Sequence, residues 1–271
     1  MPRQVRRQDI RPSAGQESGA AVSPAGDGFS LREPWPDRFA KAPLPNPYDS
    51  PGRYEAFSYS GAAGLLMNLN HRFLELGIKS SDNHRVLDVG GMAMPHWHWM
   101  NLEKTESYYF LGDPAHFDKL TIPESLRGAE VRALDYRDES LSAIPPDLTR
   151  IVASHVLEHI RDPEEAILLW CRHLRRDGVL SIAIPCDPGW TWRLLQHISS
   201  RSAIAELGFA DKRERDLFQS RDHVTSASNI LKVMRFYFRK MHVIWFPTMV
   251  PVIDFNALCI IRASMKDFYR L

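Results

Sequence analysis

Residues 154–185 read SHVLEHIRDPEEAILLWCRHLRRDGVLSIAIP, and they carry the clearest structural pattern in the chain. Asp162 is a predicted N-cap, Pro163 takes the first helical position, and acidic residues precede basic ones along the helix. Gly178 predicts the end of this helix. A β-rich run, TRIVASHVL, leads into the helix, and a buried strand, VLSIAIPC, follows it. The stretch therefore predicts a strand–helix–strand unit.

The same alternation continues on both sides of this unit. Before it, residues 53–78 predict one or two helices, and three short strand-like runs follow: HRVLDVGG, SYYFLGD and AEVRALDY. After it, MHVIWFP and FNALCIIRAS come close together without a helix between them, which predicts an antiparallel hairpin. Apolar strands that alternate with helices are typical of a parallel sheet covered on both faces. We therefore predict an α/β fold with a mostly parallel sheet and an antiparallel C-terminal hairpin.

Composition divides the chain into a leader and one domain. Residues 1–50 are rich in Pro, Gly, Ser and Arg, and such a segment buries too little apolar surface to order itself, so we predict a flexible leader. Residues 51–271 are predicted to form a single domain. Within it, residues 187–240 are a predicted inserted helical segment over the substrate, in which helices at 189–207 and 226–240 flank the polar run DKRERDLFQSRDHVTS.

Charge, hydropathy and cysteine content limit the class of protein. The 271 residues carry 34 Lys and Arg against 33 Asp and Glu, so no positive excess indicates nucleic-acid binding. No apolar run reaches the about 18 residues that span a membrane, and no apolar core follows the arginine-rich N-terminus. Cys171, Cys186 and Cys259 lie in apolar runs, which predicts buried free thiols in a reducing compartment. We expect a cytoplasmic protein, and the sequence does not indicate its oligomeric state.

Acidic residues end three of the predicted strands: Asp88, Asp113 and Asp135. Ligands of such sheets bind outside the carboxyl ends of the strands. An acid after the second strand is well placed to accept hydrogen bonds from a ribose diol, and one after the third could face an adenine edge. Any single aspartate could instead cap a helix or shape a turn. The three together favour a ligand site at this edge of the sheet.

The stretch 154–185 also resembles a characteristic block of the class I S-adenosylmethionine-dependent methyltransferases that act on small molecules. The matching features are a Leu-Glu-His triplet, an Asp-Pro pair, an amphipathic helix and a basic-Gly turn. RVLDVGG resembles the first motif of that family, and the two closing strands resemble its antiparallel end, so the resemblance covers about residues 84–186 and 241–264. It implies a doubly wound, Rossmann-like sheet of seven strands, S-adenosylmethionine as the cofactor and methyl transfer to a small-molecule acceptor.

Carried over by position, the resemblance implies seven cofactor-binding residues: Asp88, Gly90, Gly91, Asp113, Asp135, Tyr136 and Ser154. Asp88 and the two glycines would shape the turn around the amino-acid part of the cofactor. Asp113 would hold the ribose hydroxyls, and Asp135 with Tyr136 would flank the adenine. Ser154 would lie beside the methionine part, near the transferred methyl group.

The sequence departs from the family pattern at three places. Met92 and Met94 stand where glycines are usual, and a Cβ there restricts positive φ and the approach of a ligand to the backbone. Gly112 directly precedes Asp113, where the family more often has one residue between them, and Arg150 stands where an acid is common. Two interpretations remain open: a cofactor site of altered geometry, which the retained glycines and acids favour, or a site that has lost its cofactor.

Methyl transfer to oxygen needs an acceptor in line with the methyl group and often a base, although positioning supplies much of the acceleration. Three residues at the rim of the expected pocket are catalytic candidates: His155 and Asp187, which follow predicted strands, and His223 in the inserted segment. Asp222 could orient His223, but His223 could equally be a helix-entry residue before a Thr-Ser N-cap pair. Glu158 and His159 are expected to act structurally at the start of the next helix.

The run PHWHW, residues 95–99, raises the question of a metal. His96 and His98 would share one face of a strand, but Pro95 places them in a predicted helix, where residues two apart diverge. No Cys, His or Asp cluster with ligand spacing accompanies them, so we predict no metal site. The tryptophans of this run either pack the helix or line a pocket.

The pattern and the resemblance together favour O-methylation of a sugar-containing or secondary-metabolite precursor. Two alternatives stay open. The chain could be a methyltransferase-like binding or scaffold module without activity, or an enzyme of the same fold that uses the cofactor for a reaction other than methylation. Cofactor binding separates the first alternative from the enzyme.

Overall fold

The computed structural model describes residues 41, 43–47, 51–90, 94–112, 120–136 and 143–269. The chain divides into two compact units, Met1–Pro43 and Leu44–Leu271, and the second contains every described helix and strand. The predicted leader, residues 1–50, lies almost wholly outside the described residues, as do Gly91, Met92 and Asp113.

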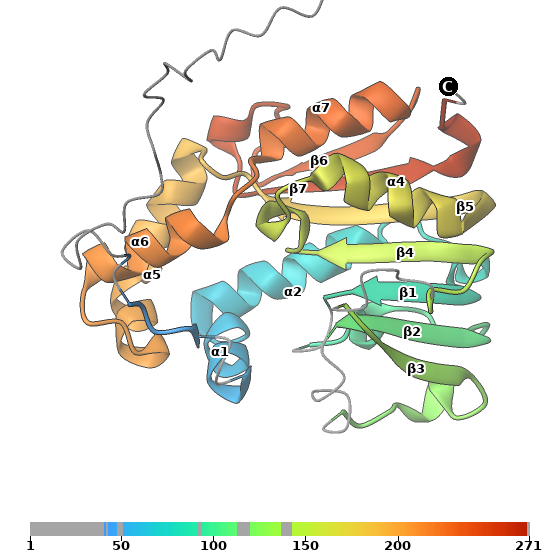
Figure 1. Cartoon of the computed structure of the whole chain (residues 1–271), viewed down its shortest axis with the longest axis horizontal. Helices are drawn as coiled ribbons and strands as arrows, with labels where there is room; N and C mark the ends of the chain where they lie inside the picture. The colour runs from blue at the N-terminus through green and yellow to red at the C-terminus, as the bar shows by residue number, and fades with distance from the viewer. Residues whose placement is uncertain are drawn as a thin grey trace, which may run out of the picture. The chain divides into compact units, whose positions relative to one another are not determined.

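A seven-stranded sheet forms the centre of the second unit (Figure 1). Its strands are β1 (Arg85–Val89), β2 (Ser107–Gly112), β3 (Glu130–Asp135), β4 (Leu148–Ser154), β5 (Leu174–Pro185), β6 (His242–Phe246) and β7 (Leu258–Ser264). They lie in the order β3-β2-β1-β4-β5-β7-β6. Neighbours among β1–β5 are parallel, whereas β7 is antiparallel to both β5 and β6. The predicted parallel sheet with an antiparallel C-terminal hairpin is confirmed.

The described α-helices are α1 (Pro51–Ser58), α2 (Gly61–Glu75), α4 (Pro163–His173), α5 (Trp190–Leu207), α6 (Lys212–Asp222) and α7 (Ala227–Tyr237). Short 3₁₀ helices join some of the elements: η3 (Ser80–Asn83), η4 (His96–Trp99), η5 (Glu124–Leu126), η6 (Leu157–His159), η7 (Ile253–Phe255) and η8 (Met265–Asp267). The helices predicted ahead of the sheet are confirmed as α1 and α2. Among the residues that the structure describes, no helix is both long and apolar enough to cross a membrane.

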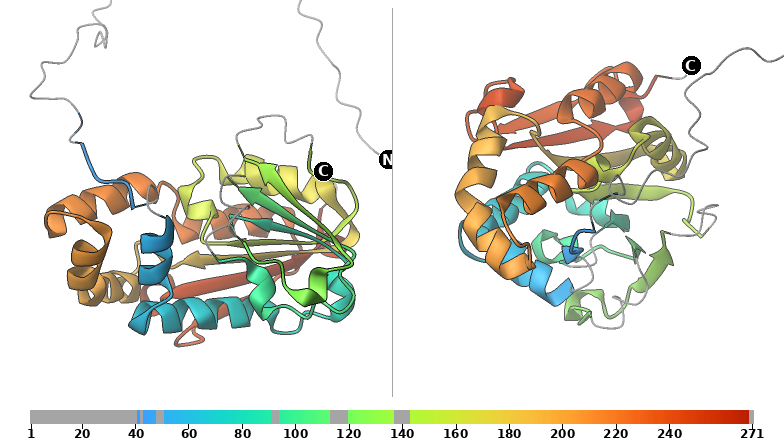
Figure 2. Two further views of the ribbon diagram at one scale, coloured as in Figure 1. Left: turned by 90° about the horizontal axis from the view of Figure 1, so that it is seen from below. Right: turned by 60° about the vertical axis from the view of Figure 1, so that its left-hand side comes forward.

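Helices cover both faces of the sheet (Figure 2). On one face, Leu74 of α2 packs with Ile260 of β7 in a buried cluster. On the other face, Trp170 of α4 and Met234 of α7 pack with Ile182 of β5. The central strand β4 accordingly buries its first six residues, as a strand covered on both sides should.

Helix α4 confirms its predicted start but not its predicted end. The Asp162 side chain accepts a hydrogen bond from the Glu165 N–H at 2.9 Å, and Pro163 opens the helix. The helix ends at His173, because β5 begins at Leu174, and Gly178 therefore does not terminate it. A Cβ on Gly178 would lie 3.0 Å from the Leu148 carbonyl oxygen, so close packing of β5 on β4 explains this glycine.

The inserted segment contains one helix more than its pattern predicts. The predicted helices at 189–207 and 226–240 correspond to α5 and α7, but the polar run between them forms α6. Asp211 caps α6 by accepting a hydrogen bond from the Glu214 N–H at 2.8 Å. The segment has almost no apolar stripe, so periodicity could not reveal this helix, although the cap could have.

The three cysteines are buried and free, as predicted. Burial raises the pKa of the Cys171 and Cys186 thiols to about 12, and it also raises the pKa of Cys259. Thiols that stay protonated at neutral pH act here as small apolar core residues.

A buried polar network joins α2 to the sheet and to η4. Arg150 of β4 is fully buried and pairs with Glu75 at 2.6 Å. The same Glu75 oxygen lies 2.7 Å from His96 Nε2, and His96 Nδ1 lies 2.8 Å from His71 Nδ1. His71 Nε2 in turn lies 2.9 Å from the Tyr59 hydroxyl. One arrangement of protons satisfies this row of hydrogen bonds. The Tyr59 hydroxyl donates to His71, His71 donates to His96, and His96 donates to Glu75.

This network predicts acid sensitivity. Burial, helped by neighbouring histidines, lowers the pKa of His71 from 6.5 to about 2, so the folded chain keeps this ring neutral. The unfolded chain protonates His71 below about pH 6.5, so this stability is full above that pH and is lost as the pH falls toward 2. We expect the free energy of unfolding to fall between pH 6.5 and 5, with His71 contributing up to about 1.4 kcal/mol per pH unit, whereas above pH 6.5 the raised pKa of His159 acts in the opposite direction.

Urea unfolding of the wild type and of His71→Phe across this pH range measures the effect. The variant should show a shallower pH dependence, whereas replacement of the exposed His242 by Phe should leave the slope unchanged. Parallel pH profiles for the wild type and His71→Phe would contradict the assignment.

Candidate functional site

The turn after β1 is held from inside by Asp88. One carboxylate oxygen of Asp88 accepts hydrogen bonds from the His96 N–H and the Tyr108 hydroxyl, both at 2.8 Å. Asp88 is buried, and burial raises the pKa of its carboxyl. Gly90 has a φ of +76°, and a Cβ there would lie 2.6 Å from Val156 Cγ2, so only glycine fits. These contacts explain how Asp88 and Gly90 hold the turn, and their part in binding the cofactor stays a prediction.

Beyond the turn, η4 is a single 3₁₀ turn where the sequence predicts the start of a helix. Trp97 is buried and packs edge-on against Phe110, with ring centroids 4.9 Å apart. Trp99 stacks on His71 at 4.0 Å. The tryptophans therefore pack this segment onto the sheet and onto α2, and His96 belongs to the buried network.

The predicted adenine side lies at the ends of β2 and β3. Asp135 ends β3, and the Tyr136 N–H donates a hydrogen bond to the Gly112 carbonyl oxygen at the end of β2. The Tyr136 side chain is exposed. The two strand ends are thus adjacent, and the assignment of Asp135 and Tyr136 to the adenine stays a prediction.

The carboxyl end of β4 presents buried polar atoms. Ser154 Oγ accepts a hydrogen bond from Asn70 Nδ2 of α2 at 2.8 Å. His155 follows with a φ of +55°, and its Nδ1 lies 3.2 Å from Glu158 Oε1. Asn70 Oδ1 and His155 Nε2 are buried and have no hydrogen-bond partner among the described residues. Buried polar atoms are rarely left unpaired, so these two indicate a place where a polar ligand group would fit.

A second group of side chains surrounds Asp187 and His223. His223 Nδ1 lies 2.8 Å from Asp187 Oδ2, which joins two of the predicted catalytic residues. Asp222 pairs instead with His159, whose Nδ1 lies 3.3 Å from Asp222 Oδ1. The rings of His159 and His223 meet edge to face, with centroids 5.0 Å apart. Asp222, which could have oriented His223, therefore contacts His159, and His159, expected to act structurally, lies beside His223.

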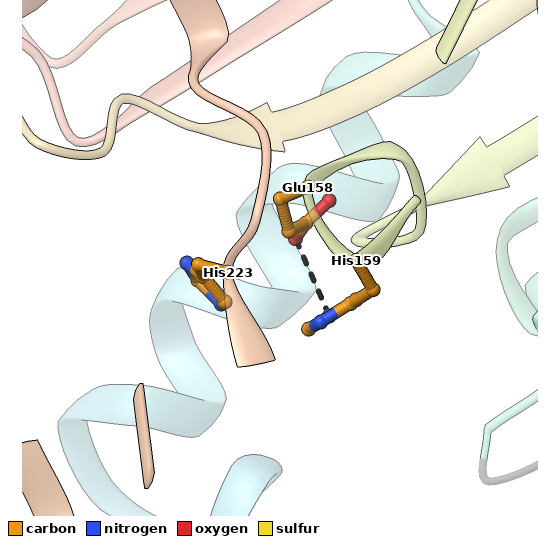
Figure 3. A group of neighbouring side chains, drawn as sticks. All are labelled: Glu158, His159 and His223. Carbon is orange, nitrogen blue, oxygen red and sulfur yellow. Dashed lines mark ion pairs between the residues drawn. The ribbon is translucent and has the colours of Figure 1, made fainter. Parts of the chain in front are cut away.

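The third predicted catalytic residue, His155, reaches this group through Glu158. Glu158 is buried, and Figure 3 shows it beside His159, with 3.9 Å between Glu158 Oε1 and His159 Nε2. Burial alone would raise the pKa of Glu158, but the hydrogen bond from His155 and the nearby imidazoles lower it overall. Burial also opposes the charged form of His159, yet Asp222 and Glu158 raise its pKa to about 9. At neutral pH, Glu158 is therefore anionic and His159 cationic.

A cavity of about 600 Å³ opens beside this group. Asp187 and His223 line one wall, and α5, α6 and the start of α7 supply the rest through Arg193, Gln196, His197, Lys212, Arg215, Asp216, Gln219, Ser226 and Asn229, among others. The helices α5 and α6 lie beyond the carboxyl ends of β4 and β5 (Figure 1). The cavity therefore adjoins the edge of the sheet where ligands of this architecture bind.

A scan against protein-family models and a search of curated proteins found no match. Solved structures do match. The N-methyltransferase NodS from Bradyrhizobium japonicum, bound to S-adenosylhomocysteine, matches 81% of this chain and 98% of its own at 13% identity and a TM-score of 0.51. A SAM-dependent methyltransferase from Archaeoglobus fulgidus matches 78% of this chain and 99% of its own at 15% identity and a TM-score of 0.51. The chain has the class I methyltransferase fold.

The CurJ carbon methyltransferase matches 78% of this chain at 16% identity and a TM-score of 0.50, and this chain spans 57% of that one. At such identities the likeness concerns the methyltransferase fold alone. Within that fold, Arg150 now has a physical explanation. It faces the interior between α2 and the sheet, where Glu75 compensates its charge, and not the ligand edge.

Proposed function

We propose that this protein binds S-adenosylmethionine and transfers its methyl group to an oxygen of a small polar molecule. The observation that carries the proposal is a juxtaposition at the end of β4. On one side lie Ser154 and the unpaired atoms of Asn70 and His155, and on the other lies the polar cavity reached by His223. A cofactor and an acceptor placed on the two sides would meet at this strand end.

The residues of the cofactor side fit the group. Asp113 would accept hydrogen bonds from the ribose, and Asp135 with Tyr136 would flank the adenine. Asn70 Oδ1, a buried acceptor without a partner among the described residues, suits a donor such as the ammonium of an amino acid. When bound, the sulfonium supplies an electrophilic methyl group. The chain's own part is to hold the reactants in line, which can supply much of the acceleration.

The acceptor side is polar and carries charges of both signs. Arg193 and Lys212 line the cavity, Arg215 pairs there with Asp216 at 3.2 Å, and the volume of about 600 Å³ lies within the usual range for small-molecule sites. His223, oriented by Asp187, stands at its wall. These features support an acceptor with hydroxyl and acidic groups, such as a sugar-containing or secondary-metabolite precursor. In this proposal the inserted segment, residues 187–240, forms the substrate-binding wall.

Calorimetry with S-adenosylhomocysteine tests the cofactor assignment. We expect one site per chain, and we expect Asp113→Ala to weaken binding severalfold or more, because the ribose hydroxyls lose their acceptor. Asp177→Ala is a matched control, since Asp177 lies in β5 and pairs with the nearby Arg175. Unchanged affinity in a folded Asp113→Ala variant would overturn the ribose assignment.

Cofactor binding by the wild type tests the broader proposal that the chain is a methyltransferase. Absence of binding heat with both S-adenosylmethionine and S-adenosylhomocysteine, at protein concentrations that detect micromolar affinity, would favour a binding or scaffold module. Mass spectrometry of a ligand that copurifies with the chain would reveal a different nucleotide if the fold serves another reaction.

A further inference from the structure

We propose that Glu158, His159 and His223 form a binding site for a divalent transition-metal ion, with Zn²⁺ as its probe. Each residue offers one ligand atom, and these atoms all lie within 4.8 Å of one another (Figure 3). The inference deepens the proposed function, because His223 also lines the acceptor cavity. Metal binding itself can be measured without cofactor or acceptor.

The spacing of the ligand atoms suits a small ion. Zn²⁺ binds nitrogen and carboxylate oxygen at about 2.0–2.2 Å, which places tetrahedral ligands about 3.4 Å apart. Glu158 Oε1 and His159 Nε2 are 3.9 Å apart, so a small side-chain rotation brings them to bonding distance. Two imidazole nitrogens and one carboxylate oxygen favour an ion such as Zn²⁺ over Mg²⁺ or Ca²⁺, which prefer oxygen ligands.

The Nδ1 atom of each histidine already has a partner. His159 Nδ1 lies 3.2 Å from the Asp222 carbonyl oxygen and 3.3 Å from Asp222 Oδ1, and His223 Nδ1 lies 2.8 Å from Asp187 Oδ2. On metal binding, each ring would keep its Nδ1 proton on this partner and present a lone pair at Nε2, and His159, which is cationic without an ion, would release its Nε2 proton. Metal-binding histidines almost always have such a partner, which fixes the tautomer and the ring orientation.

Glu158 supplies an independent indication of a missing ligand. It is 2% exposed, and its Oε1 lies 3.2 Å from His155 Nδ1. Its Oε2 is buried and has no hydrogen-bond partner in the described part of the chain. A buried carboxylate oxygen without a partner is costly, and a bound cation would compensate the charge.

The backbone holds the ligands in one local unit. The N–H groups of Val224 and Thr225 both donate to the Glu158 carbonyl oxygen, at 2.8 and 3.0 Å. The loop that carries His223 is therefore fixed to η6, which carries Glu158 and His159. Such preorganisation reduces the ordering cost of binding an ion.

Three protein ligands leave a coordination position for a fourth group. Since His223 lines the acceptor cavity, an acceptor hydroxyl can take that position. The ion would lower the pKa of that hydroxyl and fix its oxygen. With the ion bound, His223 Nε2 serves as a ligand and not as a direct proton acceptor.

Zinc titration of the metal-free full chain, by calorimetry and by metal analysis after desalting, tests the site. We expect one Zn²⁺ per chain in the wild type and loss of binding in the His159→Ala/His223→Ala double variant. Asp222→Asn should weaken binding about 10–100-fold, because it removes the charge of the carboxylate that contacts His159 Nδ1. His242→Ala, which removes an exposed histidine at the opposite end of β5–β7, should bind like the wild type.

Circular dichroism of each variant separates lost binding from lost folding. Glu158→Gln removes the charge of a proposed ligand with nearly unchanged side-chain shape. Absence of saturable binding in the wild type, or stoichiometric binding in the folded double variant, would overturn the proposal. Calorimetry with S-adenosylhomocysteine on the same samples keeps the two proposals apart. Zinc binding without cofactor binding would contradict only the proposed function. Cofactor binding without zinc binding would contradict only the metal site.

Discussion

Arg150→Leu is expected to destabilise the folded chain by about 3–5 kcal/mol, the usual cost of breaking a buried ion pair by removing one partner. Arg150 is fully buried, and besides Glu75 it donates hydrogen bonds to Ser181 Oγ, Asn83 Oδ1 and the Leu74 carbonyl oxygen. Leucine would leave the Glu75 carboxylate next to an apolar side chain. Burial opposes the charge of the Glu75 carboxylate, yet in the wild type Arg150 and His96 lower its pKa to about 2. Urea unfolding at pH 7 measures the loss.

A double variant tests the cause of that loss. Arg150→Leu/Glu75→Leu removes both charges, so it should be more stable than Arg150→Leu alone, although His96 Nε2 then lacks its acceptor. Arg127→Leu, which breaks an exposed pair with Glu124, should change stability little. A double variant less stable than Arg150→Leu would mean that packing, and not the unpaired carboxylate, causes the loss.

His223→Ala is expected to lower the turnover number by about 10²–10⁴-fold, the range for losing a positioned group that handles a proton. The same direction follows whether His223 contacts the acceptor directly or through an ion. Asp187→Asn should have a smaller effect, because the ring remains but loses the carboxylate that orients it. Release of S-adenosylhomocysteine in the presence of hydroxylated sugars and acids measures turnover.

Cofactor affinity separates this effect from a structural one. His223 lies on the acceptor side, so S-adenosylhomocysteine should bind His223→Ala as it binds the wild type. His242→Ala should retain full turnover. Full turnover by a folded His223→Ala variant would contradict the placement of the acceptor beside this residue.

Local patterns revealed most of the fold. Strand runs that end in Gly or Asp, and the Asp162-Pro163 start of α4, follow from backbone preferences that act over a few residues. They predicted the mostly parallel sheet, the antiparallel hairpin and most of the helices, whereas the number of seven strands came from the resemblance to the methyltransferase family. They failed where distant contacts decide, as at Gly178, whose role depends on the Leu148 carbonyl of a neighbouring strand.

The site was less accessible to sequence reasoning for the same reason. Chain adjacency placed Asp222 beside His223, but the fold pairs Asp222 with His159 and brings Asp187 to His223. Nothing in the helical pattern of α2 distinguished Asn70, which reaches Ser154 across the sheet edge. Arg150 looked like a change in the ligand site, and only its contact with Glu75 shows that it belongs to the core.

The most direct test of the central claim is a crystal structure of the chain grown with saturating S-adenosylhomocysteine. The account predicts the ligand at the carboxyl ends of β1–β4, with its ribose on Asp113 and its amino-acid end beside Gly90, Asn70 and Ser154. The sulfur should face the cavity that His223 lines. Crystals in which this edge of the sheet stays empty, or in which the ligand lies elsewhere, would contradict the account.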